Sequence, residues 1–516
     1  MPEHLRALIV ILVFATTIFA FAHRPSLSLT EAGSITRRRN LWFALTLSAF
    51  LSHNFWVYTL IAIPLLIYAN RRETNSPSLF FFILFALPAA PINIPGMGLV
   101  NFLFDLSHAR ILALFILLPA FFSLLRQGDS PSFGHTGPDK ALTFYLLLTV
   151  MLSLRDTSMT DTMRQAFYLF IDIFLPYFVI SRSLKNLQAF RDALLSLVLA
   201  IMVLAPIAVF ESSRHWLLYQ PLLGTLELRE GAQSYLERNG MLRAVASAGQ
   251  AIALGYLMVV GIGFYLFLQH SIQSKFIRRL GMVLLAAGLI APLSRGPWVG
   301  AAVLLVVFIA IGRYAARRLM GMTLAAMLVL PLVSMLPGGQ KVIDLLPFIG
   351  STEKSNIDYR ERLITNSVIV IQRNPWFGSV NYLDTPEMES MRQGQNIIDI
   401  VNTYISVALE KGFVGLGLFV SFFFLTLLGI YRTMRSIPDR DSEEHLLGRV
   451  LLATLLAIMI IIFTVSSITV IPIVYWSVAA LGVAYAQMIR KNVDSMAKEK
   501  TSMSTVKKEQ YSTGNQ

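Results

Sequence analysis

Apolar residues occur along this chain in long continuous runs that short polar segments separate. Runs close to the length that spans a bilayer, roughly 20 residues, recur from one end of the sequence to the other. The pattern predicts an all-α fold, a polytopic membrane protein with about 12–14 transmembrane helices. The expected spans are residues 6–22, 41–69, 78–90, 110–126, 139–154, 165–181, 190–211, 248–269, 277–293, 297–312, 319–336, 412–431, 449–466 and 469–488.

Three of these runs need comment. The run 41–69 is too long for one straight helix, and Ser52-His53-Asn54 is a candidate break. The run 78–90 is short, and proline near its end predicts a kink or a stop. The run 6–22 is similar to a signal peptide, but it lacks a convincing small-residue cleavage site, so we expect a retained helix.

Composition excludes several other classes of protein. Hydrophobic residues make up 55% of the 516 positions and charged residues 14%. A soluble protein of this size could not bury so many apolar runs in one core, and a membrane β-barrel would show short alternating segments. The chain has no cysteine, so it forms no disulfide and uses no thiolate.

The net charge of +13 predicts orientation rather than nucleic-acid binding, because lysine and arginine gather in short loops. If the spans alternate, these loops fall on one side, which we take as the cytoplasm. Arg37-Arg38-Arg39 is the exception and leaves the topology before residue 41 open. The lysine-rich tail, residues 490–516, is predicted to be a disordered cytoplasmic segment.

Two segments on the opposite side are too long to be simple turns, residues 212–247 and residues 337–411. The second is the largest soluble piece, and its apolar spacing predicts an amphipathic helix over residues 358–373 that ends at Asn374-Pro375. A second short helix is predicted over residues 400–409. The domain prediction is an N-terminal transmembrane bundle, a catalytic region with the large loop, a C-terminal transmembrane hairpin and the tail, at residues 1–204, 205–430, 431–489 and 490–516.

Four arginines stand on or near the face that carries the large loop, and they are Arg238, Arg243, Arg295 and Arg360. Arg295 lies between two apolar runs, where a permanently charged group is costly and marks a functional site. A guanidinium can grip phosphate with two parallel hydrogen bonds, so several of them at one membrane boundary would suit a lipid-linked pyrophosphate. The alternative is that each arginine reaches lipid headgroups or pairs with a nearby acid.

A second group of candidates ends the large loop, namely Asp399, Asn402, Tyr404 and Glu410. A partly buried carboxylate at the bilayer surface could act as a general base towards a hydroxyl group. The alternative is a helix start in which Asp399 is the cap and Glu410 is an interfacial charge or the partner of an arginine.

Other chemistry finds little support in the sequence. Glu211 and His215 are weaker candidates, and a glutamate that ends a span beside aromatic residues indicates an interface anchor. The histidines are scattered, so we predict neither a metal site nor a cofactor. The sequence contains no phosphate-binding loop, no dinucleotide fingerprint and no serine-histidine-aspartate spacing.

These motifs, taken in order, resemble the O-antigen ligase and polymerase superfamily over roughly residues 205–430. The residues that carry the resemblance are Arg238-Asn239-Gly240-Met241-Leu242-Arg243-Ala244, Ser294-Arg295-Gly296-Pro297-Trp298, Arg360, Asn374-Pro375-Trp376-Phe377-Gly378, Asn402-Thr403-Tyr404 and Glu410-Lys411-Gly412-Phe413-Val414-Gly415-Leu416. No single motif is specific, but their order and topology together are.

The resemblance implies a metal-independent glycosyltransferase with a GT-C-like membrane fold, located in the bacterial inner membrane with its active face in the periplasm. It implies a donor glycan on undecaprenyl pyrophosphate, and a chain-length regulator and a flippase as further partners beside membrane lipids. By the same resemblance, Arg243 and Arg295 match the pyrophosphate-binding arginines, and Arg360 matches a loop arginine near the same cavity.

One position departs from the family pattern. Ligases of this family carry a histidine just before the asparagine of the Asn-x-Tyr element, where this chain has Val401. Either Asp399 takes the role of base, or no base is needed. We therefore expect a polymerase of exopolysaccharide or O-antigen repeat units, with a ligase that transfers glycan to lipid A core as the alternative and a transporter as a more distant one.

Overall fold

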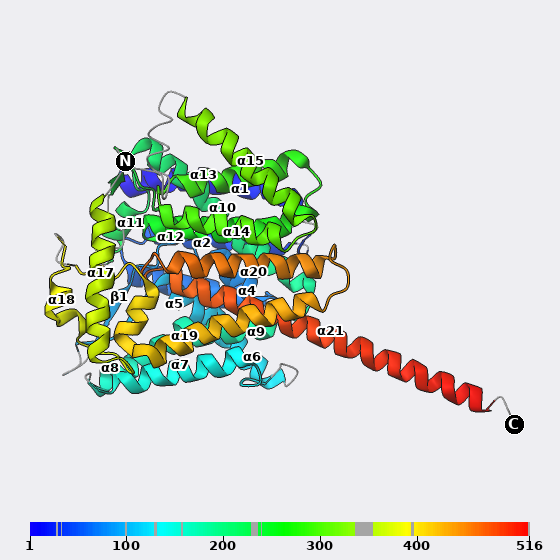
Figure 1. Cartoon of the computed structure of the whole chain (residues 1–516). Helices are drawn as coiled ribbons and strands as arrows, with labels where there is room; N and C mark the ends of the chain where they lie inside the picture. The colour runs from blue at the N-terminus through cyan, green and yellow to red at the C-terminus, as the bar shows by residue number, and fades with distance from the viewer. Residues whose placement is uncertain are drawn as a thin grey trace.

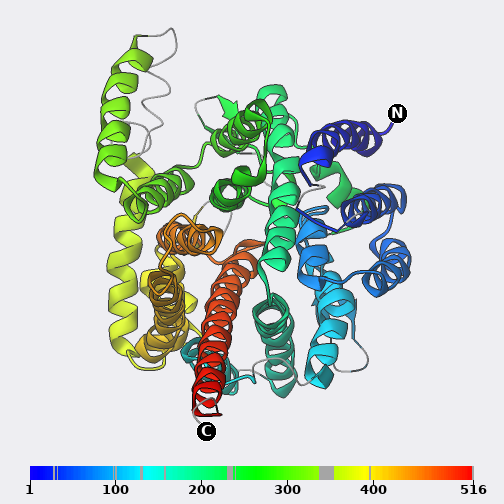
Figure 2. The same ribbon diagram turned by 90° about the vertical axis from the view of Figure 1, so that its right-hand side faces the viewer.

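The structure is a computed structural model that describes residues 1–26, 29–31, 33–96, 98, 101–127, 132–155, 158–228, 236–238, 240–335, 354–393 and 397–513. It confirms the predicted all-α fold of a polytopic membrane protein. Most helices run back and forth along one common axis (Figure 1), and many of them are seen end-on when the molecule is viewed along that axis (Figure 2).

The first part of the chain forms helices α1 (Glu3–Ser26), α2 (Ser34–Leu51), α3 (Phe55–Arg71), α4 (Ser76–Ile83), α5 (His108–Leu112), α6 (Leu118–Gln127), α7 (Gly137–Ser153), α8 (Met159–Leu169), α9 (Leu175–Ser183) and α10 (Leu187–Arg214). Single π-helical turns, Ala113–Leu117 and Phe170–Phe174, join α5 to α6 and α8 to α9. The strands β1 (Ile92–Pro95) and β2 (Phe102–Leu106) pair antiparallel between α4 and α5.

The second part forms α11 (Gln220–Thr225), α12 (Ala251–Leu268), α13 (Lys275–Ile290), α14 (Arg295–Ala310), α15 (Ala315–Ser334), α17 (Lys354–Arg373), α18 (Pro386–Glu389), α19 (Thr403–Arg435), α20 (Glu443–Ile462) and α21 (Ile471–Thr513). The strands β3 (Glu237–Arg238) and β4 (Met241–Leu242) form a second antiparallel hairpin. Short 3-10 turns lie at Ala246–Ala248, Gln269–Ser271 and Tyr382–Asp384.

Most apolar runs of the sequence form helices, but the run 78–90 is helical only as far as Ile83, where α4 ends, and residues 84–90 are not helical. Among the described residues, eight helices are long and apolar enough to cross a membrane, and two shorter apolar helices, α3 and α14, accompany them. Four of the eight, α10, α12, α20 and α21, have more than 80% of their apolar windows buried inside the protein. These four helices therefore form the centre of the bundle.

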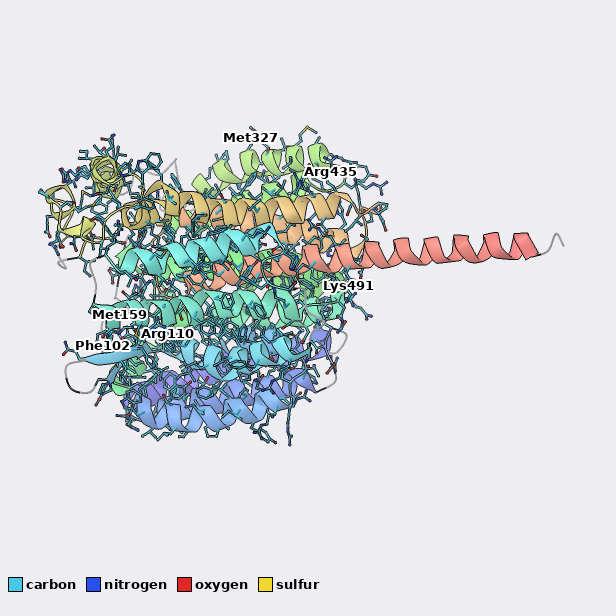
Figure 3. All side chains as sticks on the ribbon, turned by 90° about the horizontal axis from the view of Figure 1, so that it is seen from below. Phe102, Arg110, Met159, Met327, Arg435 and Lys491 are labelled. Carbon is cyan, nitrogen blue, oxygen red and sulfur yellow. The ribbon has the colours of Figure 1, made fainter. Side chains whose placement is uncertain are left out.

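The bundle has two ends with different chemistry. Phe102, Arg110 and Met159 lie at one end, together with α17, α18 and the two hairpins, and we call this the loop end (Figures 1 and 3). Arg435 and Lys491 lie at the other end, where the arginine- and lysine-rich connections are found, and we call this the basic end. This segregation of charge agrees with the positive-inside expectation.

The run 41–69 forms two helices rather than one. α2 stops at Leu51, His53 has a left-handed φ of 51°, and the Asn54 side chain caps α3 by accepting the Trp56 N–H at 2.8 Å. The additional reversal places the start of α2 at the basic end, beside the end of α3. Arg37-Arg38-Arg39 therefore lies at the basic end, and it is no exception to the charge bias once residues 41–69 are counted as two helices.

Buried ion pairs hold the bundle at this end. Arg38 is 1% exposed, and its guanidinium donates to Glu73 at 2.7 Å and to Asp192 at 2.7 Å. Arg182 and Asp139 form a second pair at 2.7 Å, with both side chains fully buried. A buried charge without a partner is strongly destabilising, so each of these arginines requires its carboxylates.

The amphipathic helix predicted in the large loop exists as α17, which lies across the loop end, roughly perpendicular to the bundle axis (Figures 1 and 2). Tyr359, Leu363 and Val370 are buried on one side of α17, in a small core that includes Met388 and Leu409. The part of the predicted loop at residues 336–353 lies outside the described residues.

Two glycine motifs join the end of α17 to the start of α19 through backbone contacts. The N–H of Phe413 donates to the carbonyl of Pro375 at 2.7 Å, and the N–H of Ser379 donates to the carbonyl of Leu409 at 2.9 Å. Gly378 and Gly412 both have positive φ, at 64° and 63°. Gly412 also kinks α19, separating a short segment at the loop end from the long apolar helix. We call this contact the glycine junction.

Candidate functional site

The site is built around the tight turn between α13 and α14. Arg243 donates from Nε to the carbonyl of Pro292 at 3.2 Å and from Nη2 to the hydroxyl of Ser294 at 3.0 Å. Arg238 donates from Nη1 to the carbonyl of Leu293. Arg295 follows as the first residue of α14. Three of the four predicted arginines therefore meet at one turn, and each of them is half-buried.

The position of this turn adds to its positive potential. The N-terminus of α14 begins at Arg295, and unsatisfied N–H groups at a helix start favour anions. Leu293 has a φ of 49°, a left-handed conformation that lets the chain reverse sharply before α14. The turn thus presents guanidinium groups and a helix N-terminus on the same surface.

A buried glutamate holds the segment that carries Arg243. Glu211, which is fully buried, accepts the N–H groups of Val245 at 2.9 Å and Ala246 at 2.8 Å with one oxygen. Its other oxygen accepts the N–H of Leu218 at 2.9 Å. The interpretation of Glu211 as an interface anchor was wrong, because the side chain points inward and organises the segment between α10 and α12.

The connection between α20 and α21 forms the other side of the site. Arg360, on α17, donates from Nη2 to the carbonyl of Thr464 at 3.3 Å. A Cβ on Gly296 would stand 2.5 Å from the Thr464 hydroxyl, so the glycine next to Arg295 lets these two segments meet. Arg360 and Arg295 are thereby brought against the same short connection.

The charges at this point influence one another. Burial lowers the pKa of the Arg360 guanidinium, the Asp399 carboxylate raises it, and the positive charge of Arg238 lowers it. Arg360 therefore lies within electrostatic reach of both Arg238 and Asp399. Arg360 and Asp399 both contact the α20–α21 connection, through Thr464 and Ser466, and the same connection meets Gly296 at the start of α14. We call Arg238, Arg243, Arg295 and Arg360 the arginine cluster.

Asp399 lies in the segment before α19, contacts the α20–α21 connection through Ser466, and is more exposed than expected. Its Oδ1 accepts the hydroxyl of Ser466 at 2.6 Å, and its backbone carbonyl accepts the hydroxyl of Tyr359 at 3.0 Å. The side chain is exposed to solvent, so the expectation of a partly buried carboxylate was wrong. An exposed carboxylate held by one hydroxyl remains accessible to a substrate hydroxyl.

Asn402 and Tyr404 both form hydrogen bonds within the helical bundle. The Asn402 side chain caps α19 by accepting the N–H groups of Tyr404 at 2.9 Å and Ile405 at 3.2 Å. The Tyr404 hydroxyl donates to the carbonyl of Met459 on α20 at 3.0 Å. These two residues fix the start of α19 against α20, and their contact with substrate stays a prediction.

Glu410 pairs with a lysine and not with an arginine. Its Oε2 lies 2.5 Å from the ammonium group of Lys411, and Ser406 donates to its Oε1 at 3.1 Å. The hydroxyl of Tyr382 completes this environment at 3.5 Å. Glu410 is therefore a charged residue paired within the protein, and it supports the segment next to the glycine junction.

A cavity of about 440 Å³ opens from the α20–α21 connection. Its polar walls include Arg110 paired with Asp172 at 2.7 Å, together with Gln250 and Thr469. Arg110 is labelled at the loop end in Figure 3. The cavity thus shares one wall, the α20–α21 connection, with the arginine cluster.

Sequence reasoning missed several residues of this site. Thr464, Ser466 and Ser467 form the polar connection against which the cluster is built, and Arg155 binds the carbonyls of Phe377 and Gly378 near the glycine junction. The sequence does contain a sign of this connection, because these hydroxyl-bearing residues lie close together between two apolar spans. Of the weaker candidates, His215 contacts the carbonyl of Gly240 through Nε2 at 3.1 Å, and the described residues include no cluster with metal-ligand geometry.

Comparison with known families supports the resemblance seen in the sequence. Residues 280–420 match the family model described as O-antigen ligase. This region belongs to the O-antigen ligase and polymerase superfamily and contains Arg295, Arg360 and Asp399. Members of the family are glycosyltransferase-like enzymes, either ligases or polymerases. No curated protein matches the chain.

Proposed function

From the membership of residues 280–420 in the O-antigen ligase and polymerase superfamily, we propose that this protein polymerises oligosaccharide repeat units carried on undecaprenyl pyrophosphate. The product is an exopolysaccharide or an O-antigen. The loop end faces the periplasm of a bacterial inner membrane, and the basic end faces the cytoplasm, as the distribution of arginine and lysine favours. A chain-length regulator and a flippase of the same pathway are the proposed partners, beside membrane lipids.

The observation that carries the proposal is the convergence of the arginine cluster on the α13–α14 turn and the α20–α21 connection. A pyrophosphate leaving group gains negative charge as its bond to the sugar breaks. Guanidinium groups and a helix N-terminus fixed in advance stabilise that charge more than bulk water does. Four convergent arginines at a membrane boundary fit a diphosphate better than they fit a single carboxylate.

The proposed reaction is one displacement at the anomeric carbon of the donor. An acceptor sugar hydroxyl forms the new carbon–oxygen bond, the bond to the pyrophosphate oxygen breaks, and the leaving group departs with both electrons. Asp399 takes the proton of the attacking hydroxyl, because its carboxylate is exposed beside the cluster and is held by Ser466. The cavity lined by Arg110, Asp172 and Gln250 offers polar groups to the hydroxyls of the glycan.

Asp399→Asn keeps the shape and the hydrogen bond from Ser466 but removes the base. We expect turnover to fall by about a hundredfold with little change in KM, because a general base acts in the transition state rather than in substrate binding. The measurement is the rate of polymer formation by purified protein with a lipid-linked donor. Full activity of Asp399→Asn would show that Asp399 is not the base and would favour attack by the acceptor hydroxyl without a general base.

A deletion strain distinguishes the polymerase from the ligase. If the protein polymerises, the strain loses long chains and keeps single repeat units. If it is the ligase suggested by the family description, finished chains accumulate on the lipid carrier. Val401, in the place of the histidine expected in ligases, favours the polymerase. A transporter predicts a third result, in which purified protein forms no glycosidic bond from a lipid-linked donor.

A further inference from the structure

The basic end contains a second cavity, of about 280 Å³, far from the arginine cluster. It opens between the end of α12, the α14–α15 connection and the start of α20. The residues that line it are predominantly cationic, namely His270, Arg313, Tyr314, Arg318, Arg440, Asp441, Leu446 and Arg449. None of these residues takes part in the proposed reaction.

Arg449 is the most informative residue of this cavity because it is 8% exposed. Its Nη2 donates to the carbonyl of Phe308 at 2.7 Å, and its guanidinium stands 4.3 Å from the centre of the Phe308 ring. Its Nε is buried and has no hydrogen-bond partner among the described residues. Arg449 therefore keeps a charge and a donor that the surrounding protein does not satisfy.

The backbone around Arg449 leaves room for its guanidinium. A Cβ on Gly312, in the α14–α15 connection, would overlap Nη2 of Arg449. The carbonyl of Phe308 belongs to the last turn of α14, where the helix dipole favours a cation. The chain thus holds a guanidinium in a fixed position at the wall of the cavity, unlike an arginine that reaches freely to the membrane surface.

The charge of the lining is not balanced by protein. Asp441 is the only acid among the lining residues, and it pairs with Arg313 at 2.8 Å. Arg318, Arg440 and Arg449 form no ion pair among the described residues. Several cations gathered around one small volume repel one another, and an anion in the cavity would relieve this repulsion and the cost of burying Arg449.

We propose that this cavity binds a phosphate group. Guanidinium groups recognise phosphate through charge-assisted and often bidentate hydrogen bonds, which a chloride ion cannot accept in the same geometry. The cavity has room for one headgroup, and it lies at the basic end of the bundle. The phosphate comes from an anionic phospholipid or from the aqueous phase.

The test uses full-length protein in a neutral detergent and compares three additives, namely phosphatidylglycerol, inorganic phosphate and phosphatidylcholine. The readouts are the apparent melting temperature and the dissociation constant of each additive. We expect phosphatidylglycerol, whose headgroup has a net negative charge, to raise the melting temperature. Phosphatidylcholine should leave it unchanged, because the quaternary ammonium of its headgroup balances the phosphate charge and is repelled by the arginines. Protection by phosphatidylglycerol alone identifies the lipid as the source, and equal protection by inorganic phosphate identifies a free anion site.

The decisive variant is Arg318→Gln with Arg440→Gln, because both side chains are exposed and their replacement does not disturb the core. Each lost charge-assisted hydrogen bond weakens binding by about tenfold, so the double variant should bind about a hundredfold more weakly. Arg279→Gln with Arg432→Gln is the matched control, since it removes the same charge from exposed arginines of the same end outside the cavity.

Two results would overturn the proposal. One is that neither phosphatidylglycerol nor inorganic phosphate protects the protein. The other is that the cavity double variant and the control lose affinity for phosphate equally, which would mean that binding depends only on the overall positive charge of this end. Polymer formation measured in the same preparations is a separate readout, because Arg318 and Arg440 lie far from the arginine cluster.

Discussion

Replacing Arg295 by alanine is expected to reduce polymer formation by about a hundredfold to a thousandfold, the usual cost of removing one fixed donor from a developing negative charge. Arg295 opens α14 at the turn that Arg238 and Arg243 also contact, so its guanidinium adds to a preformed positive surface. Because the loss acts on the transition state, turnover should fall more than the affinity for the donor. The measurement is product formation from a lipid-linked donor, with the amount of protein in the membrane determined in parallel.

The matched control for this experiment is Arg373→Ala. Arg373 lies at the end of α17 on the same end of the molecule, is exposed and pairs with Glu387. An exposed ion pair contributes about 1 kcal/mol or less to stability, so this variant should keep its activity. Wild-type polymer length with Arg295→Ala, at normal protein levels, would remove the arginine cluster from the proposed reaction.

Replacing Gly412 by alanine is expected to break the glycine junction. Gly412 has φ 63° and ψ −168°, a backbone conformation that is open essentially to glycine alone. A Cβ there would overlap the carbonyl of Trp376 and the amide nitrogen of Phe377, and these backbone atoms cannot move aside as a flexible side chain would. Strain and overlap together should destabilise the junction by about 4 kcal/mol or more.

Gly417→Ala provides the control on the same helix. A Cβ at Gly417 meets no atom within 4 Å, and alanine favours the helix over glycine by about 1 kcal/mol. We expect Gly412→Ala to lower the apparent melting temperature and to expose the segment between α17 and α19 to protease, while Gly417→Ala does neither. Equal behaviour of the two variants would show that the junction contributes nothing to stability.

Much of the architecture could be predicted because apolar runs translate directly into helices in a bilayer. The break at Ser52-His53-Asn54, the helix that ends at Asn374-Pro375 and the short helix before Gly412 are all present in the structure. Each of these features is encoded by residues that are neighbours in the sequence. Local signals of this kind require no knowledge of the rest of the fold.

The features that escaped prediction depend on partners far apart in the chain. Arg182 meets Asp139 across 43 residues, and the arginine cluster is completed by Thr464, which is 104 residues from Arg360. In the sequence, Glu211 is an acidic residue close to aromatic residues. Its inward orientation is evident only from the three backbone N–H groups that donate to its carboxylate. The catalytic roles assigned to Asp399 and Arg295 stay predictions, since their test is kinetic.

The cluster around Arg38 also constrains the order in which this protein can be made. During synthesis Arg38 leaves the ribosome 35 residues before Glu73 and 154 residues before Asp192. Until α10 has been synthesised, the first helices carry a cation that only one of its two carboxylates can neutralise. The amino-terminal helices can therefore dock fully only after α10 has been synthesised, so their docking is a late step of biogenesis.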